Sequence, residues 1–299
     1  MKLCYYKLPD GAQNFGDNLN PWLWERLLPG VLDDDPTTAF VGIGTLLNSN
    51  LPNRTREAYK RAVFATGVGY GKGVPVVDDS YKIYCLRGPL STQALGLPDH
   101  LAVTDGAVLL RRLVNLSDRN LHRNLYKFAF MPHYELAGEG WKSVCESIGF
   151  GYIDPRWSTE AVITAIGQTE VVLAEAMHGA IVADALRVPW VPVVTSRTIL
   201  SFKWQDWCAS VGVNYEPMQT QRVFDPRHQT DLLTPLRTVR HWLRIRSAAS
   251  RLKQLALRSR PILSLDNRIE RLTVQLEERL QQFKDDVAAG YFAIYRPDP

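Results

Sequence analysis

Short apolar runs alternate with amphipathic segments along most of the chain. In the first part, the runs that predict buried strands lie at 2–8, 38–47, 62–71 and 81–88, with 100–110 closing this half. Helix-like segments lie between them at 14–28 and 89–97. Several runs end in glycine-rich turns, and such strands interleaved with helices are typical of a parallel sheet covered on both faces.

The same alternation continues after the polar segment 116–124, which has the composition of a linker. The predicted elements of this second half, strand and helix in turn, are 127–135, 140–149, 150–155, 159–168, 171–175, 179–186, 188–194 and 201–212. Two alternating halves predict an α/β protein with two Rossmann-like, doubly wound domains, residues 1–122 and 123–235, that face a cleft. Ligands of such sheets bind at the carboxyl ends of the strands.

The pattern changes after residue 235. Residues 236–260 carry eight Arg and Lys and no Asp or Glu, with apolar side chains at helical spacing. Residues 266–290 predict one amphipathic helix that ends near a glycine. Residues 236–299 are therefore predicted to form a basic amphipathic helical tail. This tail either contacts an anionic membrane surface, packs on the rest of the chain, or dimerises.

Composition places the chain among ordinary globular proteins, with 45% hydrophobic and 22% charged residues. The net charge of +4 is uneven, because residues 236–299 hold 13 Lys and Arg against 7 Asp and Glu. The remainder is net acidic, which argues against nucleic acid as a partner. The four cysteines form no CxxC pair, which argues against a zinc knuckle or a disulfide framework and indicates a reducing compartment.

Targeting signals are not visible in the sequence. The first residues lack the apolar core of a signal peptide, and no apolar run approaches the ~18 residues that a membrane span needs. We therefore expect a cytoplasmic protein, either free or peripheral on the inner face of the inner membrane.

A lone histidine stands where the apolar run 171–173 meets the alanine-rich segment 179–186. His178 is therefore predicted at a strand-to-helix joint, beside unbonded N–H groups and the positive end of a helix dipole. That position suits holding an anion and moving a proton, and a histidine that only caps or packs is the alternative. His133 ends another predicted strand of this half, so the two histidines can meet at one cleft.

Polar side chains also follow predicted strands in the first half. Asn14 and Asp17 belong to the loop NFGDN, which is either a ligand loop at the cleft or an ordinary turn with a helix cap. Arg87 precedes a predicted helix, where it either binds a carboxylate or phosphate or pairs with Asp99 or Asp105 at the surface. Asp105 itself is either a catalytic carboxylate or a helix cap.

The segment 195–207 places Arg197 and Lys203 beside Trp204. Cations beside an aromatic ring suit an anionic ligand or a sugar, whereas a packing helix with Trp204 in the core is the alternative. The loop GVGYGK at 67–72 lacks the spacing of a P-loop and is interpreted as a flexible strand-end loop. No HExxH, CxxC, GxSxG or kinase signature is present, so we expect neither a bound metal nor a cofactor.

Several of these motifs occur in one order: NFGDN, GIGTLL, ATGVGYG, LRGPLS, VTDGAVLL and AEAMHGAIVADALRVPWV. Together they resemble the polysaccharide pyruvyl transferase family over about residues 1–215, and the ordered set is far more specific than any single motif. The resemblance is strongest to the branch that adds pyruvate ketals to exopolysaccharides such as succinoglycan. It implies a GT-B-like fold, phosphoenolpyruvate as donor, release of phosphate, and a sugar acceptor that is often lipid-linked.

The resemblance also assigns roles to residues. The HG histidine of the family corresponds to His178, and its RGP arginine to Arg87. The family pattern has an arginine two residues before the histidine, where this chain has Ala176, so Arg197 or Lys203 is the candidate for the missing charge. His178 is expected to bind the donor, with Gly179 beside it, and to act as an acid or as the partner of the leaving phosphate.

The chemistry of that reaction and the motifs themselves suggest the remaining roles: Arg87, Arg197 and Lys203 as donor contacts, Asp17, Asp105 or His133 as base, and Asn14 and Trp204 as acceptor contacts. A lipid-linked oligosaccharide would lie at an anionic membrane surface, which the basic residues of 236–260 could contact. Two other functions fit the pattern: a GT-B glycosyltransferase that uses a nucleotide sugar, and a non-catalytic protein of polysaccharide assembly held to the membrane by its tail.

Overall fold

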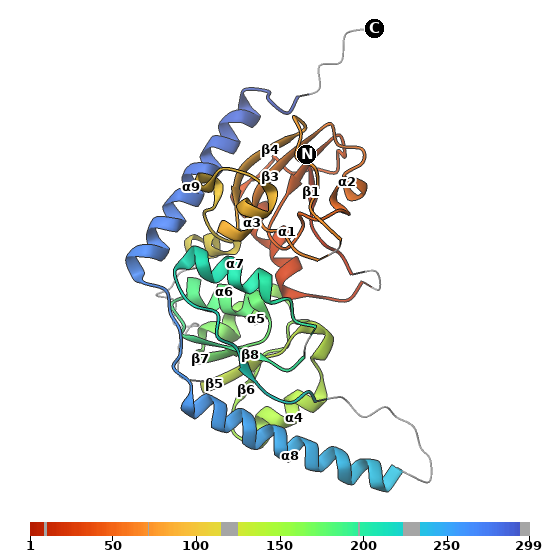
Figure 1. Cartoon of the computed structure of the whole chain (residues 1–299), viewed down its shortest axis with the longest axis vertical. Coiled ribbons are helices and arrows are strands. Elements are labelled where there is room, and N and C mark those ends of the chain that lie inside the picture. Colours follow the sequence, from red (N-terminus) through yellow and green to blue (C-terminus); the bar gives the residue numbers. More distant parts are fainter. Residues whose placement is uncertain (9–10, 71, 115–124, 197, 224–233, 294–299) are drawn as a thin grey trace.

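The computed structural model of the protein describes residues 1–8, 11–70, 72–114, 125–196, 198–223 and 234–293. Within them, two parallel β-sheets are flanked by helices, and the predicted α/β class is confirmed (Figure 1). The predicted linker at 116–124 lies outside the described residues.

The first sheet contains four parallel strands that follow one another in chain order. They are β1 (Lys2–Cys4), β2 (Thr38–Val41), β3 (Lys60–Thr66) and β4 (Tyr81–Leu86). The helical segments of this half are α1 (Phe15–Leu27), α2 (Leu51–Arg54), α3 (Pro89–Leu95) and the 3-10 helices η1 (Asp99–Leu101) and η2 (Gly106–Arg112).

Both faces of the first sheet are buried. Phe40 and Phe64 share one face with Trp24 of α1, whose ring centroid lies 4.9 Å from that of Phe40 and 5.2 Å from that of Phe64. Their chain neighbours Val41 and Val63 belong to a second apolar cluster on the opposite face. A parallel sheet covered on both sides needs such continuous apolar runs, which explains why the strands were visible in the sequence.

The second sheet contains five parallel strands in the order β6-β5-β7-β8-β9. They are β5 (Tyr126–Met131), β6 (Gly151–Tyr152), β7 (Thr169–Ala174), β8 (Trp190–Val194) and β9 (Met218–Gln219). The helical segments are η4 (Tyr134–Leu136), α4 (Glu139–Ser147), α5 (Thr159–Gly167), α6 (Met177–Ala185) and α7 (Ser201–Val211). The chain places β6 on one side of β5 and β7 on the other, so the strand order reverses between β5 and β7.

Helices cover both faces of the second sheet as well. Phe128 and Phe130 of β5 pack in a cluster with Trp141 of α4, whereas Ala129 and Met131 belong to the cluster on the other face that contains α5 and α6. This reversal and double coverage agree with the predicted doubly wound arrangement. The described strands of the first sheet follow one another in chain order and show no reversal. The strand order of the first sheet therefore differs from the predicted doubly wound arrangement.

One predicted strand end is wrong. Asp105 was expected after a strand within VTDGA, but the structure shows only an isolated bridge between Leu86 and Ala102. Asp105 instead caps η2, because its carboxylate accepts a hydrogen bond of 3.0 Å from the N–H of Ala107. The cap that the sequence offered is therefore present, and a catalytic role for the other carboxylate oxygen stays a prediction.

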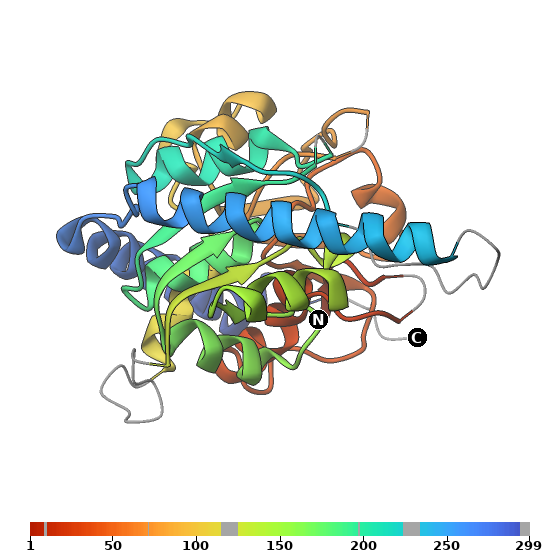
Figure 2. The ribbon, with the colours of Figure 1, turned by 90° about the horizontal axis from the view of Figure 1, so that it is seen from below.

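The C-terminal segment is not a separate tail. α8 (Thr234–Arg258) lies across the second sheet next to α4, and Leu252 and Leu255 are buried there (Figure 2). α9 (Asp266–Ala288) returns to the first sheet, where Phe283 lies 5.0 Å from Phe40 between ring centroids (Figure 1). Of the alternatives for 236–299, packing on the rest of the chain is confirmed for both helices.

A buried carboxylate fixes the connection between these two helices. Asp184 of α6 is completely buried, and it accepts hydrogen bonds from the indole N–H of Trp190 at 3.0 Å and from the backbone N–H of Ser264 at 2.9 Å. The hydroxyl of Ser264 also donates to Asp184. The chain between α8 and α9 is therefore attached to the second sheet by a fully satisfied polar cluster.

In the described part of the chain, every helix is too short or too polar to cross a lipid bilayer.

Candidate active site

The candidate site lies where the strand order of the second sheet reverses. The chain leaves β5 into His133 and leaves β7 into Glu175, and His178 follows in the first turn of α6. Doubly wound sheets bind ligands at this kind of position, at the carboxyl ends of the strands. A small cavity of about 40 Å³ opens here, with Asn14, His133, His178 and Lys203 among its lining residues.

His178 and Asp105 face one another across the two halves of the chain. Nε2 of His178 lies 3.7 Å from Oδ2 of Asp105, and neither atom has a hydrogen-bond partner among the residues that the structure describes. Burial, together with the charges of Lys203 and Arg87, lowers the pKa of His178 to about 3, whereas burial raises the pKa of Asp105 to about 6. Two adjacent, buried and unsatisfied groups form a place where a proton can be exchanged once a ligand changes the local charge.

Two glycines allow this histidine to sit where it does. A Cβ atom on Gly16, in the first turn of α1, would lie 2.3 Å from Nδ1 of His178. A Cβ atom on Gly179 would lie 2.5 Å from Sδ of Met131, at the end of β5. The N–H of Gly179 donates to the carbonyl of Ala176, and its expected contact with a donor stays a prediction. The glycines of NFGDN and HG therefore let α1, β5 and α6 converge around the imidazole.

Lys203 supplies the positive charge of the cavity. It comes from α7, is 8% exposed, and donates a hydrogen bond of 2.7 Å to the hydroxyl of Tyr70. Burial and the nearby Arg87 lower its pKa to about 8. Lys203 lines the same cavity as Ala176, the position at which the resemblance led us to expect an arginine. The other candidate for that charge, Arg197, lies outside the described residues.

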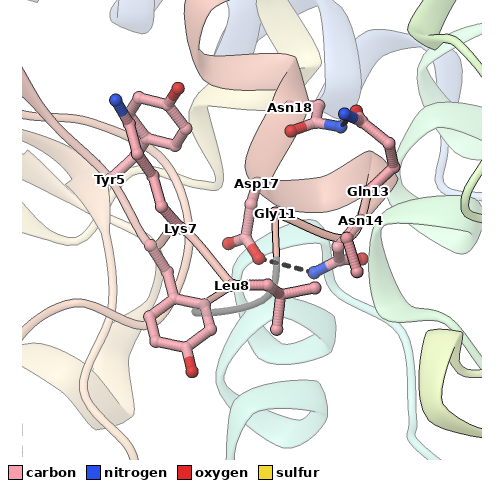
Figure 3. A pocket seen from close by; sticks show the side chains of 10 residues that line it. Tyr5, Lys7, Leu8, Gly11, Gln13, Asn14, Asp17 and Asn18 are labelled. Atoms are coloured by element: carbon pink, nitrogen blue, oxygen red, sulfur yellow. Dashed lines mark hydrogen bonds between the residues drawn. The ribbon is translucent and has the colours of Figure 1, made fainter.

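Asn14 and Asp17 border a second cavity next to the first. It has a volume of about 190 Å³, and Asn14 lines both cavities. The Asn14 amide donates a hydrogen bond of 2.6 Å to Oδ2 of Asp17 (Figure 3). Burial is the largest effect on the Asp17 carboxyl and raises its pKa to about 6. Asn14 is also the N-cap residue of α1, although its side chain bonds Asp17 and not the helix backbone.

His133 is held at the cavity by a buried acid. The backbone N–H of His133 donates to Oε2 of Glu175 at 3.1 Å, and Oε1 of Glu175 accepts from the backbone N–H and the hydroxyl of Thr195, both at 2.7 Å. Glu175 thus joins the ends of β5, β7 and β8. Burial lowers the pKa of His133 to about 4, so its imidazole is neutral near pH 7. A role for His133 as base stays a prediction.

Arg87 lies behind the cavity and is fully buried. Its Nε pairs with Asp206 at 3.0 Å, and its Nη atoms donate to the carbonyls of Gly44 and Val68 and to the hydroxyl of Thr45. The alternative interpretation, a surface arginine paired with Asp99 or Asp105, is therefore wrong, because the partner is the buried Asp206. All three nitrogen atoms of the guanidinium are hydrogen-bonded to other protein groups. Arg87 therefore acts on the site through its charge, which lowers the pKa values of His178 and Lys203.

Trp204 was expected to contact the acceptor, and the structure places it elsewhere. Its side chain is completely buried and stacks on Tyr215, with 5.1 Å between the ring centroids. Trp190 and Trp207 complete the cluster. A ring with no exposed face has none to offer a sugar, so the alternative of a packing helix is correct for this residue.

Several contributors to the site were missed by sequence reasoning. Glu175, Asp206 and Tyr70 are the clearest, because each bonds a candidate residue from a distant part of the chain. A signal was available for Glu175, since an acid at the end of an apolar strand needs a buried partner. For Asp206 and Tyr70 the sequence carries no comparable signal.

Comparison with known proteins gives two matches. The family described as polysaccharide pyruvyl transferase matches residues 77–197. The succinoglycan biosynthesis protein ExoV of Rhizobium meliloti (strain 1021) is 44% identical over 220 residues, which is 73% of this chain and 67% of that protein. The part that the family matches, residues 77–197, contains Arg87, Asp105, His133 and His178. The chain belongs to the polysaccharide pyruvyl transferase family.

Proposed function

We propose that the protein transfers pyruvate from phosphoenolpyruvate to a sugar of an exopolysaccharide repeat unit, forming a ketal and releasing phosphate. One observation carries this proposal most strongly. His178, Asp105 and Lys203 converge on the N-terminus of α6 at the reversal point of a doubly wound sheet. The family membership and the relative named for succinoglycan biosynthesis support the same reaction.

The donor is a polyanion, and the site has the means to hold one. The first N–H groups of a helix have no partner within the helix and carry partial positive charge, and α6 begins at this cavity. Lys203 adds a full charge, and Arg87 adds positive potential from behind. We assign the phosphate and carboxylate of phosphoenolpyruvate to this group of residues.

The reaction needs a proton at one carbon and two hydroxyl groups at another. A proton added to the methylene carbon gives a methyl group, and two acceptor hydroxyls form C–O bonds to the central carbon while the bond to phosphate breaks. One hydroxyl proton replaces the one used at the methyl carbon, and the other leaves with phosphate. His178 is suited to the proton transfers, because anionic donor binding raises its pKa and Asp105 lies beside it.

The site draws residues from both halves of the chain. Gly16 and Asp105 come from the first half and His178 and Lys203 from the second. We therefore propose that residues 1–122 and 123–235 act as two domains of GT-B type with the donor between them. A nucleotide-sugar glycosyltransferase and a non-catalytic assembly protein remain the competing functions, and ligand binding separates them.

A thermal shift experiment tests the donor. We expect phosphoenolpyruvate to raise the melting temperature of the protein, because a ligand that binds only the folded state stabilises it. A panel of nucleotide sugars serves as the comparison. Stabilisation by a nucleotide sugar and not by phosphoenolpyruvate would favour a glycosyltransferase and would contradict the proposal.

The pH dependence of kcat/KM for phosphoenolpyruvate is expected to be bell-shaped. The carboxyls of Asp17 and Asp105 have pKa values raised to about 6, so they are ionised above that pH. Lys203 has a pKa lowered to about 8, so its charge is lost above that pH. Activity should fall at least tenfold per pH unit well below 6, where two carboxyls become protonated, and about tenfold per unit above 8. In Lys203→Arg the charge no longer titrates, and the alkaline limb should move upward; a flat profile from pH 5 to 9 would refute the assignment.

We also propose that α8 brings the protein to an anionic membrane surface, where a lipid-linked acceptor would lie. Its outer side exposes Trp242 and Leu243, each more than half accessible, next to Arg244 and Arg246. An interfacial helix combines apolar and basic side chains in this way, and each basic residue adds about 1 kcal/mol near an anionic surface.

Vesicle co-sedimentation tests this contact. We expect the protein to sediment with vesicles that contain phosphatidylserine and to remain free with phosphatidylcholine alone. Trp242→Ser with Arg246→Gln should reduce binding several-fold, whereas Arg26→Gln, an exposed arginine of α1, should leave it unchanged. Equal sedimentation with both vesicle types, or binding unaffected by salt, would contradict an electrostatic contact.

A further inference from the structure

A cavity of about 190 Å³ lies beside the proposed donor site. It lies between the segment that follows β1 and the first turn of α1. We propose that this cavity is the subsite for one sugar ring of the acceptor, with Asp17 as the group that takes the proton of the attacking hydroxyl. This inference rests on the proposed transfer of pyruvate to a sugar.

The volume of the cavity fits a small ligand. Drug-sized molecules occupy pockets of about 300–1,000 Å³, so a cavity of about 190 Å³ suits a single ring and not a nucleotide. A larger cavity of about 410 Å³ is lined by Met1, Thr38 and Phe292 and shares no lining residue with the cavity of His178. Size and adjacency together select the cavity near Asp17.

The lining has the chemistry that sugars require. Tyr5 and Tyr6 provide aromatic rings, on which the C–H faces of a sugar can pack. Gln13 and Asn18 provide amides, each with both donors and acceptors for hydroxyl groups. The Asn18 amide donates to the Gln13 side chain, so these two groups satisfy one another, and hydroxyl groups of a sugar could replace that bond.

The placement of the side chains agrees with this assignment. Figure 3 shows Asp17 between Tyr5 and Lys7 on one side and Gln13, Asn14 and Asn18 on the other. Aromatic and amide groups thus surround the carboxylate that would receive the proton. A sugar held among them presents its hydroxyls to Asp17.

Asp17 stands at the junction of the two cavities. Its hydrogen-bond partner Asn14 lines both cavities. The charge of Lys203 in the donor cavity lowers the pKa of Asp17, although burial, which raises this pKa, has the larger effect. Among the described residues only Asn14 bonds this carboxylate, through Oδ2, which leaves Oδ1 for a hydroxyl group. When the hydroxyl oxygen forms its bond to the central carbon of the donor, its proton passes to Asp17 and from there to the phosphate that leaves.

The test separates acceptor binding from donor binding. The probes are phosphoenolpyruvate and two simple acceptors, p-nitrophenyl β-glucoside and p-nitrophenyl β-galactoside, followed by phosphate release and by saturation-transfer NMR. In the double variant Gln13→Ala, Asn18→Ala we expect KM for the hexoside to rise about tenfold or more, with thermal stabilisation by phosphoenolpyruvate unchanged. Asn53→Ala with Gln93→Ala removes two exposed amides elsewhere and should change neither value.

Each other outcome identifies what has failed. An unchanged KM for the hexoside in the double variant overturns the subsite, and so does a loss of phosphoenolpyruvate binding in that variant, because the cavity would then belong to the donor. A wild-type protein that binds phosphoenolpyruvate but neither hexoside also overturns it. Wild-type protein that does not bind phosphoenolpyruvate overturns the proposed function itself. Asp17→Asn should lower kcat without weakening hexoside binding, and the acid limb that remains in its pH profile should be that of Asp105 alone.

Discussion

Replacing His178 with alanine is expected to lower turnover with phosphoenolpyruvate by about 10²–10⁴-fold, the usual contribution of a positioned acid–base group. The imidazole is the only titratable side chain within the first turn of α6, and it lies 3.7 Å from Asp105. Its removal takes away the proton carrier and leaves the buried carboxyl of Asp105 facing an empty space. Phosphate release from phosphoenolpyruvate in the presence of an acceptor measures the effect.

Two further variants make the result specific. His100→Ala removes an exposed histidine from η1 and should retain full turnover. Asp105→Asn can keep the cap on the N–H of Ala107 but cannot accept a proton from His178, so its turnover should fall while the protein stays folded. Full activity of His178→Ala would show that the histidine only packs between Gly16 and Asp105, and the proposed mechanism would be wrong.

Replacing Arg87 with methionine should lower the free energy of unfolding by about 3–5 kcal/mol, because it leaves the buried carboxylate of Asp206 without its counter-charge. Both side chains have no exposed surface, and the guanidinium also bonds the carbonyls of Gly44 and Val68. Three segments that are distant in the sequence lose a common partner. Denaturant titration followed by circular dichroism measures the change.

A surface arginine provides the matched control. The side chain of Arg112 is 34% exposed and pairs with Glu270 and Glu277. Arg112→Met should therefore lower the free energy of unfolding by only about 1 kcal/mol or less. If Arg87→Met were as stable as the wild type but failed to bind phosphoenolpyruvate, Arg87 would contact the donor directly, as the sequence suggested. Stability loss with retained binding per folded molecule would establish the structural role.

Most strands of both sheets could be predicted, because parallel strands buried on two faces must be apolar throughout. Runs such as 171–173 and 188–194 were interpreted as buried strands, and the structure has β7 and β8 there. The position of His178 at a strand-to-helix joint followed from the same pattern. β9 could not be predicted, because its two residues, Met218 and Gln219, are both exposed and carry no period.

The sequence was less informative about which side chains meet. Trp204 and Lys203 are neighbours in one helix, yet one packs in a tryptophan cluster and the other lines the cavity. A helix turns by about 100° per residue, so adjacent residues face different surroundings. Arg87 and Asp206 lie 119 positions apart, and only the packing of α3 against α7 brings them together. Such long-range pairs require the fold to be known.

The return of α9 to the first sheet has a consequence during synthesis on the ribosome. Phe283 packs against Phe40 and Tyr84, so the core of the first sheet is closed by a helix that emerges about 200 residues after β4. At about 5–20 residues per second, roughly 10–40 seconds pass between the two events. During that interval the aromatic face of the nascent sheet lacks its cover, which makes it a natural client surface for chaperones that bind near the exit tunnel.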